Sequence, residues 1–262
     1  MARNTDSIKH TIIVAVILCV VCSIIVSTAA VVLRPAQKAN KAIDFKRNIL
    51  AAAGMLDVSK EAKSVNEQFS IVETKVVDLR TGKYTDAVSN IEIYDQRKAA
   101  KDTSMSQKLS SDEDIAGLSR RENYSKVFLV KNASGLDKLI LPIRGYGLWS
   151  TLKGFVALES DLNTVVGLGY YEHGETPGLG GEVDNPKWKS LWSGKKVYSD
   201  NGDVALTVIK GKVTSTTRQA EHKVDGLSGA TLTSNGVDNM IKFWLGKNGF
   251  APYLNNLKKG GA

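Results

Sequence analysis

The apolar residues divide the chain into one long uncharged run and a region of short apolar segments. Residues 11–33 contain no charged side chain. A helix rises about 1.5 Å per residue, so this run is long enough to cross a hydrocarbon layer about 30 Å thick. No other run in the sequence is as long and as apolar. We therefore expect one transmembrane helix over 11–33, preceded by a short head over 1–10.

A cleaved signal peptide is the alternative for this N-terminal run. Lys9 precedes it, and Ser27-Thr28-Ala29 is a tolerable cleavage site. The run is longer than the hydrophobic region of about 7–15 residues in signal peptides, and Arg34-Pro35 follows it like a helix stop. These features favour an uncleaved anchor.

A helical pattern continues beyond the uncharged run. Four apolar residues follow one another at spacings of 3, 4 and 3, namely Ala42, Phe45, Ile49 and Ala52. This periodicity is typical of one face of a helix. We therefore expect a stalk helix and linker over 34–58, with the helix itself inside 36–55.

The remaining residues, 59–262, have the pattern of a globular domain. Their β-rich runs are short and are separated by Gly, Asn, Asp or Lys. Strands are predicted over 76–79, 91–94, 127–131, 139–143, 154–158, 165–171 and 204–209. We interpret the polar segment 95–125 as a surface loop with room for one short helix, and 188–192 as a helical turn.

The last regular element that we expect is a helix. Apolar residues recur at i, i+3, i+4, i+7 and i+8, at Val237, Met240, Ile241, Trp244 and Leu245. Gly246 or Gly249 would close this helix. The order of elements predicts an α+β fold, a twisted antiparallel sheet with helices packed on it.

Composition supports a globular protein and excludes nucleic-acid binding. The chain is 42% hydrophobic and 24% charged, as is usual for a folded domain. The net charge is +8, but Lys and Arg are interspersed with Asp and Glu and form no basic stripe with aromatic residues. Asp112-Glu113-Asp114 lacks the spaced ligands and turn glycine of a calcium loop, so we expect a solvated charge cluster and no metal site.

Both cysteines lie in the predicted membrane helix. Cys19 and Cys22 are three residues apart, and a hydrocarbon environment does not favour the thiolate that redox or metal chemistry needs. We interpret them as small apolar residues. Residues 34–262 contain no cysteine. The predicted domain therefore has no disulfide, no Cys-ligated iron–sulfur cluster and no thiol nucleophile.

Two glycine-rich segments are candidates for a ligand site. The first covers 173–182, after a predicted strand, and the second covers 225–234 and leads into the final helix. Free N–H groups and the positive end of the helix dipole make a helix start favourable for phosphate. We expect Thr233 or Ser234 to be the N-cap of that helix.

Two other interpretations of the second segment compete with phosphate binding. Residues 226–230 come within one residue of the G-x-S-x-G nucleophile elbow, with Ser228 as nucleophile and His173 or His222 as base. The polar residues before the segment and the lack of a His after Ser228 make a hydrolase a poor fit. A glycine turn that only starts a helix also remains open.

The motif residues themselves carry a family resemblance. Residues 225–233, Asp-Gly-Leu-Ser-Gly-Ala-Thr-Leu-Thr, resemble the flavinylation motif of the FMN-binding domain family. In that family the Thr that ends Ser-Gly-Ala-Thr is joined to the phosphate of FMN, which implies a covalent phosphodiester at Thr231. Glu175–Gly180 resembles the family's glycine-rich loop beside the isoalloxazine ring.

The resemblance implies further cofactor contacts and one recognition residue. The implied FMN contacts besides Thr231 are Ser228, Gly229, Ala230, Thr233, Glu175, Thr176, Gly178, Leu179 and Trp149. Glu175 beside the flavin would disfavour its anionic reduced form, and Trp149 either stacks on the ring or packs in the core. Asp225 matches the acidic residue that opens the recognition motif of a flavin transferase, which uses FAD as donor.

The anchor, the stalk and Gly145–Trp149 together resemble the C subunits of sodium-translocating NADH:quinone oxidoreductases. This resemblance implies that single electrons pass from an iron–sulfur centre through FMN to a second FMN subunit in the membrane, coupled to sodium export. Two alternatives remain open. One is the homologous FMN subunit of the Rnf ferredoxin:NAD oxidoreductase, and the other is a membrane-anchored binding or assembly protein with no redox role.

Two arguments about orientation disagree. Arg3 and Lys9 precede the anchor, whereas five cations follow it within 34–47, so the positive-inside rule taken literally puts the domain in the cytoplasm. The resemblance implies the bacterial inner membrane, with the FMN domain in the periplasm. We expect the periplasmic orientation, because the head is short and the rule is weak for large exported domains.

Overall fold

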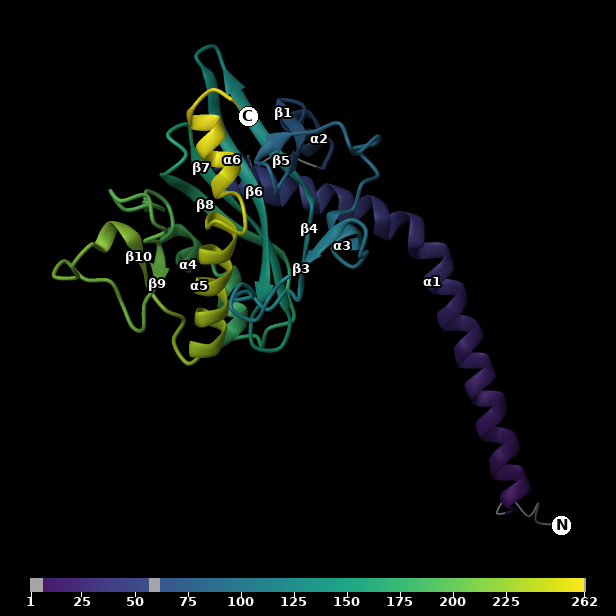
Figure 1. Cartoon of the computed structure of the whole chain (residues 1–262). Helices are drawn as coiled ribbons and strands as arrows, with labels where there is room; N and C mark the ends of the chain where they lie inside the picture. Colours follow the sequence, from purple (N-terminus) through teal and green to yellow (C-terminus); the bar gives the residue numbers. More distant parts are fainter. Residues whose placement is uncertain (1–6, 57–61, 262) are drawn as a thin grey trace. The chain divides into compact units, whose positions relative to one another are not determined.

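The computed structural model describes residues 7–56 and 62–261 (Figure 1). The chain separates into two compact units, the first ending at Asp44 and the second running from Phe45 to the C-terminus. The first unit consists of most of helix α1, Ile8–Ala52, and the second contains every strand of the described chain. The candidate site lies wholly in the second unit.

Helix α1 does not stop where the sequence predicts. It runs for 45 residues with Pro35 in its interior, so the break expected at Arg34-Pro35 is wrong. A proline removes one backbone hydrogen bond and costs a helix interior about 3 kcal/mol. Long helical stretches on both sides of Pro35 offset that cost. The division of the chain at residues 10, 33 and 58 stays a prediction, and residues 57–61 lie outside the described part.

The N-terminal part of α1 has the character of a membrane span. Within the described residues it is the one helix long and apolar enough to cross a bilayer, with a mean hydropathy of 3.0 over its most apolar window. That window is 0% buried against the rest of the protein. An exposed apolar helix surface of this length fits a single-pass membrane anchor.

The second unit is built on one antiparallel sheet of six strands in the order β2-β1-β5-β6-β7-β8. In chain order these strands are β1 Val72–Asp78, β2 Lys83–Tyr84, β5 Tyr124–Asn132, β6 Gly135–Tyr146, β7 Thr151–Glu159 and β8 Val165–Glu172. The expected α+β fold with an antiparallel sheet is confirmed, and five of the predicted strands lie within it.

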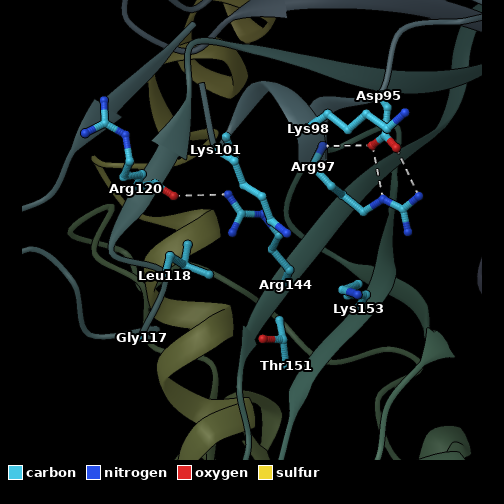
Figure 2. Close-up of a pocket in the computed structure, with 11 residues that line it drawn as sticks. Asp95, Arg97, Lys98, Lys101, Gly117, Leu118, Arg120, Arg144, Thr151 and Lys153 are labelled. Atoms are coloured by element: carbon cyan, nitrogen blue, oxygen red, sulfur yellow. Dashed lines mark hydrogen bonds and ion pairs between the residues drawn. The ribbon is translucent and has the colours of Figure 1, made fainter. Parts of the chain in front are cut away.

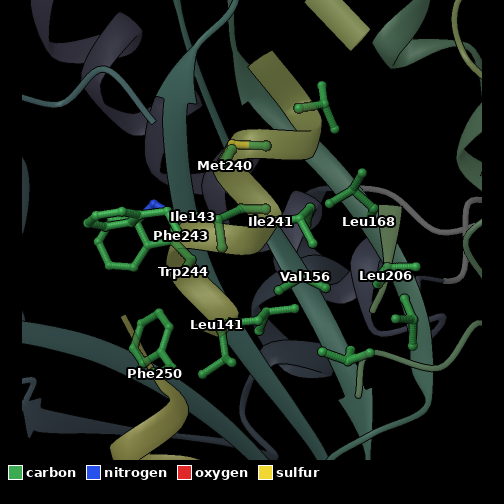
Figure 3. Close-up of a cluster of buried hydrophobic side chains, with 14 of the residues drawn as sticks. Leu141, Ile143, Val156, Leu168, Leu206, Met240, Ile241, Phe243, Trp244 and Phe250 are labelled. Atoms are coloured by element: carbon green, nitrogen blue, oxygen red, sulfur yellow. The ribbon is translucent and has the colours of Figure 1, made fainter. Parts of the chain in front are cut away.

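Side chains of successive residues leave this sheet on opposite faces, and both faces are covered. Phe155 meets the ring of Phe45, from the last turns of α1, at 5.1 Å between centroids. Val156, the next residue, belongs to the core cluster that includes Met240 and Trp244 of helix α5, Thr231–Leu245 (Figure 3). Because neither face is left to solvent, the central strands are apolar runs rather than alternating ones.

Smaller elements complete the domain. Helices are α2 Ala62–Phe69, α3 Gln96–Ala99, α4 Pro186–Ser190 and α6 Ala251–Lys258, and short 3-10 turns are η1 Gly180–Asp184 and η2 Ala220–His222. Two small sheets pair β3 Ser106–Lys108 with β4 Arg120–Glu122, and β9 Thr207–Val208 with β10 Lys223–Val224. The expected helical turn over 188–192 corresponds to α4.

Three local predictions are wrong. The strand expected over 91–94 is a turn, because the Asn90 side chain accepts hydrogen bonds from the N–H groups of Glu92 and Ile93. The strand expected over 204–209 is reduced to two residues. The segment 95–125 is more than a loop, since it contributes a strand pair as well as α3.

The final helix of the prediction is α5, and Gly246 closes it as expected. The chain does not end its regular structure there, because α6 follows with a proline in its first turn. Trp244 anchors α5 to the sheet: it is fully buried, and its Nε1 donates to the carbonyl of Arg144 in β6 at 2.6 Å. This tryptophan holds the helix that begins with the candidate acceptor residue.

Replacing Trp244 tests how much this packing contributes. Trp244→Ala should lower the free energy of unfolding by about 3–5 kcal/mol, because it leaves a large cavity. Trp244→Phe keeps most of the ring but leaves the Arg144 carbonyl without its donor, and should cost about 1 kcal/mol. Urea unfolding of the detergent-solubilised chain, followed by circular dichroism, measures both. The control is Trp149→Ala, which removes a solvent-exposed indole; an equal loss there would contradict the packing argument.

Candidate functional site

A buried carboxylate joins three separate segments at one end of the sheet. Glu175 is 5% exposed and follows β8 in the glycine-rich segment 173–182. It accepts hydrogen bonds from the backbone N–H groups of Leu148, Trp149 and Ser150 at 3.0–3.2 Å. It also accepts from the Thr233 hydroxyl of α5 at 2.8 Å. The glycine-rich loop, the β6–β7 turn and the start of α5 are thereby tied together.

Hydrogen bonding fixes the charge state of this carboxylate. Burial raises the pKa of Glu175, but the donated hydrogen bonds from Thr233 and from the N–H groups of Trp149, Ser150 and Leu148 outweigh burial and lower the pKa below its ordinary value. Glu175 is therefore ionised at neutral pH. Its oxygens accept bonds from the chain itself, so Glu175 holds the site's segments together, and its contact with a flavin stays a prediction.

Glycines make room for this carboxylate. A Cβ atom on Gly180 would lie 2.5 Å from Oγ1 of Thr233 and 2.7 Å from Oε2 of Glu175. A Cβ atom on Gly147 would lie 2.7 Å from Oε1 of Glu175. These are distances that real Cβ atoms do not adopt, so both positions require glycine for steric reasons.

The start of α5 has the free donors that an anion needs. The helix begins at Thr231 with Ala230 as its N-cap, and no side chain caps it. The expectation of Thr233 or Ser234 as N-cap is wrong, because the helix begins before them and both lie in its first turn. There Thr233 donates to Glu175 and Ser234 donates to the Ala230 carbonyl. The first N–H groups of α5 therefore have no acceptor from a capping side chain.

Thr231 itself is exposed, and a small cavity lies beside it. The cavity measures about 40 Å³ and is lined by residues from the β9 region and from the start of α5: Val208, Ile209, Lys210, Gly211, Gly226, Leu227, Thr231, Ser234 and Asn235. A lysine, a free helix N-terminus and a glycine-rich backbone form a set of groups that suits a phosphate. The residues present at Thr231 thus fit the phosphate end of FMN.

Large apolar side chains near this helix start face solvent. Trp149 is 68% exposed and Leu232 is 58% exposed. Leu179 is 46% exposed, and its Cδ2 would lie 3.2 Å from a Cβ atom on Gly229. Exposed apolar groups gathered on segments that a polar network holds in place form a surface for a flat apolar ligand. The alternative that Trp149 packs in the core is wrong.

The remaining FMN contacts expected from the sequence differ in how exposed they are. Ser228, Gly229, Thr176 and Gly178 are exposed, whereas Ala230 is buried. Gly178 and Gly229 both have positive φ, +76° and +73°, in the region where glycine is favoured. Each glycine lies in a turn directly before another expected contact, the exposed Leu179 and the buried Ala230.

Asp225 is partly committed to the local structure. Its Oδ1 accepts a hydrogen bond from the Val213 N–H at 2.8 Å, and its backbone carbonyl accepts from Trp188 Nε1 at 2.8 Å. The side chain is half-buried rather than free at the surface. Replacement of Asp225 by alanine would therefore change local hydrogen bonding as well as charge.

The structure does not support the hydrolase alternative. His173 is bonded to Asp184 at 2.7 Å, and His222 is bonded to the Lys196 carbonyl at 2.8 Å. In the described part of the chain neither histidine hydrogen-bonds to Ser228. The described residues also hold no cluster of three or more His, Cys, Asp or Glu suited to a metal.

Sequence reasoning missed several residues at this site. Ser150 donates to the Glu175 carboxylate, and Leu148 contributes only its backbone N–H, so no side-chain pattern could reveal Leu148. Thr233 was expected at the site, but its hydrogen bond to Glu175 was not. Lys210 lies in a segment remote in sequence from Thr231. Leu232 was missed although the sequence carries a signal for it. It is an apolar residue inside a motif of otherwise small and polar residues, which makes it a candidate ligand contact.

Comparison with known proteins identifies the class of this domain. Residues 147–246 match the family model described as FMN-binding domain. That span contains the β6–β7 turn, Glu175, the cavity and Thr231, so the matched region coincides with the site built above. The chain thus carries an FMN-binding domain behind an N-terminal apolar helix.

Full-length relatives specify the family. The chain is 54% identical over 260 residues to the C subunit of the Na(+)-translocating NADH-quinone reductase of Pseudomonas aeruginosa, over 99% of each chain. It is 49% identical over 262 residues to the C subunit of the same reductase in Vibrio anguillarum, over 100% of this chain and 99% of the relative. The chain belongs to the family of C subunits of the Na(+)-translocating NADH-quinone reductases, which are oxidoreductase complexes.

Solved structures agree with this assignment. The crystal structure of Shewanella oneidensis NqrC matches with a TM-score of 0.77 and 38% identity, over 84% of this chain and 99% of that one. The structure of the C subunit from Parabacteroides distasonis matches with a TM-score of 0.66 and 27% identity, over 85% and 96%. The fold described above is therefore that of the family.

Glu175 variants test the carboxylate network. Glu175→Ala leaves the turn N–H groups and the Thr233 hydroxyl without their acceptor, and should lower the free energy of unfolding by about 2–3 kcal/mol at pH 7. The pKa of Glu175 is lower in the folded protein, so its contribution is present above the unfolded value of about 4.3 and is lost as pH falls through the folded value. Unfolding of the wild type and of Glu175→Gln between pH 7 and pH 3 checks this. The wild type should lose more stability than Glu175→Gln; parallel curves would contradict the assignment.

Proposed function

We propose that FMN is attached to this domain by a phosphodiester at Thr231. The observation that carries the proposal is the exposed Thr231 hydroxyl at an uncapped helix start, beside a cavity lined by Lys210 and glycine backbone. Matching of the same region to the FMN-binding domain supports it. The proposed FMN contacts are those expected from the sequence. Glu175 and Thr233 contribute by holding the β6–β7 turn and the start of α5 in place beside the cofactor.

The chain's own residues perform three tasks in this proposal. The start of α5 and Lys210 bind the phosphate, and Thr231 provides the bond that retains the cofactor. A covalent tether replaces equilibrium affinity by a permanent local concentration, so occupancy does not depend on free FMN. Trp149 and Leu179 provide the apolar surface that orients the ring. Bound FMN supplies one-electron chemistry, and the protein sets its position and surroundings.

We further propose that the domain relays single electrons between an iron–sulfur centre and an FMN of neighbouring membrane subunits, coupled to sodium export. The lack of cysteine in residues 34–262 means that the iron–sulfur ligands must belong to partners. Names of the relatives, subunits of a Na(+)-translocating NADH-quinone reductase, support this setting over the Rnf complex or a protein without redox function.

The proposed location is the bacterial inner membrane, with the FMN domain in the periplasm and the N-terminal part of α1 as a single-pass anchor. The apolar helix surface supports the anchor. The anchor contains no Asp, Glu, Lys or Arg over residues 11–33, so it offers no ionisable group for sodium. If this subunit contributes to sodium coupling, the contribution would come from motion of the domain rather than from an ionisable group of the anchor.

Removing the acceptor hydroxyl tests the covalent attachment. Thr231→Ala should lose all covalent flavin while keeping a folded domain, because Thr231 is exposed and lies outside the Glu175 network. The measurement is in-gel flavin fluorescence after SDS denaturation, with intact mass as a second readout, in cells that co-express a flavin transferase. Thr216→Ala removes another exposed hydroxyl and should stay fluorescent. FMN still attached to Thr231→Ala would refute the acceptor assignment, and a dark wild type would refute covalent flavinylation.

Asp225 variants separate recognition from structure. Asp225→Asn removes the charge but keeps an oxygen that can accept from the Val213 N–H, so the fold should be preserved. If the transferase recognises the carboxylate, flavin incorporation at Thr231 should fall at least about tenfold, the equivalent of one lost charged hydrogen bond. Circular dichroism verifies folding, and the ratio of flavinylated to bare mass measures incorporation. Normal incorporation into Asp225→Asn would show that Asp225 acts only through structure.

A further inference from the structure

A hollow lined mainly by cationic side chains lies beside Arg144 of β6 and Thr151 and Lys153 of β7 (Figure 2). None of its lining residues belongs to the candidate flavin site. Its volume is about 430 Å³. Its charged lining residues are Asp95, Arg97, Lys98, Lys101, Arg120, Arg144 and Lys153. They come from α3 and its flanks and from the strands β4, β6 and β7, so cations converge from several sides.

Carboxylates neutralise only part of this charge. Asp95 pairs with Arg97 at 3.1 Å. Glu172, which is outside the lining, is shared between Arg97 and Lys153. Glu122 is buried and pairs with Arg144 at 2.5 Å. Six cations thus face one acidic lining residue and two carboxylates that reach them from outside the hollow.

Two of the cations have no partner in the described chain. Lys98 and Lys101 are exposed, and their ammonium groups form no ion pair or hydrogen bond with any described residue. Arg144 is different, because it is held by Glu122 and by the carbonyl of Arg120 at 3.2 Å. The hollow therefore combines a guanidinium held by two acceptors with two exposed ammonium groups that have no partner among the described residues.

Like charges gathered around one hollow repel one another. Two unit charges 4 Å apart interact by about 1 kcal/mol in bulk water and by more where protein displaces the water. An anion among them reverses the sign of that contribution. We propose that this hollow binds a phosphoryl group, carried by a small phosphate ester or by the headgroup of an anionic phospholipid.

The arrangement of donors favours phosphate over carboxylate. A phosphoryl group presents several oxygens in different directions, and guanidinium and ammonium groups are its usual partners. Here Arg144, Lys98, Lys101 and the Thr151 hydroxyl border the same volume. Leu118 adds an apolar wall beside them, where the organic part of an ester would lie. The volume is in the range of small-molecule sites.

Titration of the full-length, flavinylated chain in detergent with inorganic phosphate and with glycerol 3-phosphate tests this proposal. Isothermal titration calorimetry at low salt should show saturable binding to one site. Malonate, a dianion that carries two carboxylates, is the counter-probe and should bind more weakly. Absence of saturable phosphate binding, or equal binding of malonate, would overturn the assignment.

A double charge reversal locates the site. Lys98→Glu/Lys101→Glu should weaken phosphate binding by about tenfold or more, since two attractive contacts become repulsive. The matched control is Lys83→Glu/Lys259→Glu, which changes the net charge equally at exposed positions outside the lining. The control should keep wild-type affinity. Equal loss in both variants would mean a general charge effect and would refute a specific site.

The source of the phosphoryl group is decided in nanodiscs. With phosphatidylcholine alone, wild-type affinity for phosphate should equal that in detergent. If the lipid headgroup occupies the hollow, adding phosphatidylglycerol should weaken the apparent affinity of the wild type for phosphate, because lipid and phosphate compete for one site. The Lys83→Glu/Lys259→Glu control should show the same weakening. Unchanged affinity would assign the site to a soluble phosphate ester. In either case binding that survives Lys98→Glu/Lys101→Glu would overturn the proposal.

Discussion

The hydrogen bonds to the Glu175 carboxylate are the interaction on which the candidate site depends. One buried side chain accepts from three consecutive N–H groups of a turn and from the hydroxyl of Thr233. These donors come from the β6–β7 turn and from the start of α5, two segments far apart in the sequence. The carboxylate thus fixes the start of α5 against the turn that carries Trp149, while Trp244 holds the rest of the helix on the sheet. A charge that is costly to bury becomes favourable because every oxygen has donors.

Steric demands set the sequence around that carboxylate. Gly147 and Gly180 approach it so closely that any side chain would collide with it. The helix start itself is uncapped because the N-cap residue is Ala230, whose side chain has no hydrogen-bonding group. Thr233 and Ser234 lie inside the first turn, where their hydroxyls bind Glu175 and the Ala230 carbonyl. The first N–H groups of α5 therefore receive no hydrogen bond acceptor from a capping side chain.

The sequence predicts the sheet and the position of the site better than it predicts the hydrogen bonds within the site. Apolar runs such as 154–158 are strands because both faces are buried, and the period of residues 237–245 identifies α5 correctly. Local side-chain competition defeats the pattern at Ile93, where Asn90 takes the backbone donors. The role of Glu175 could not be deduced, because its partners in the β6–β7 turn are backbone groups far away in sequence. Pattern reasoning finds which residues gather, but three-dimensional hydrogen bonding decides what each one does.

The Glu175 network has a consequence for the order of events in the cell. Its donors all belong to the polypeptide, and the exposed Thr231 hydroxyl lies outside it. Under the proposed function, folding therefore does not wait for a cofactor. An enzyme that attaches FMN under this proposal would meet an acceptor hydroxyl already placed on a folded surface. Attachment of the flavin would then report that the segments tied by Glu175 had assembled.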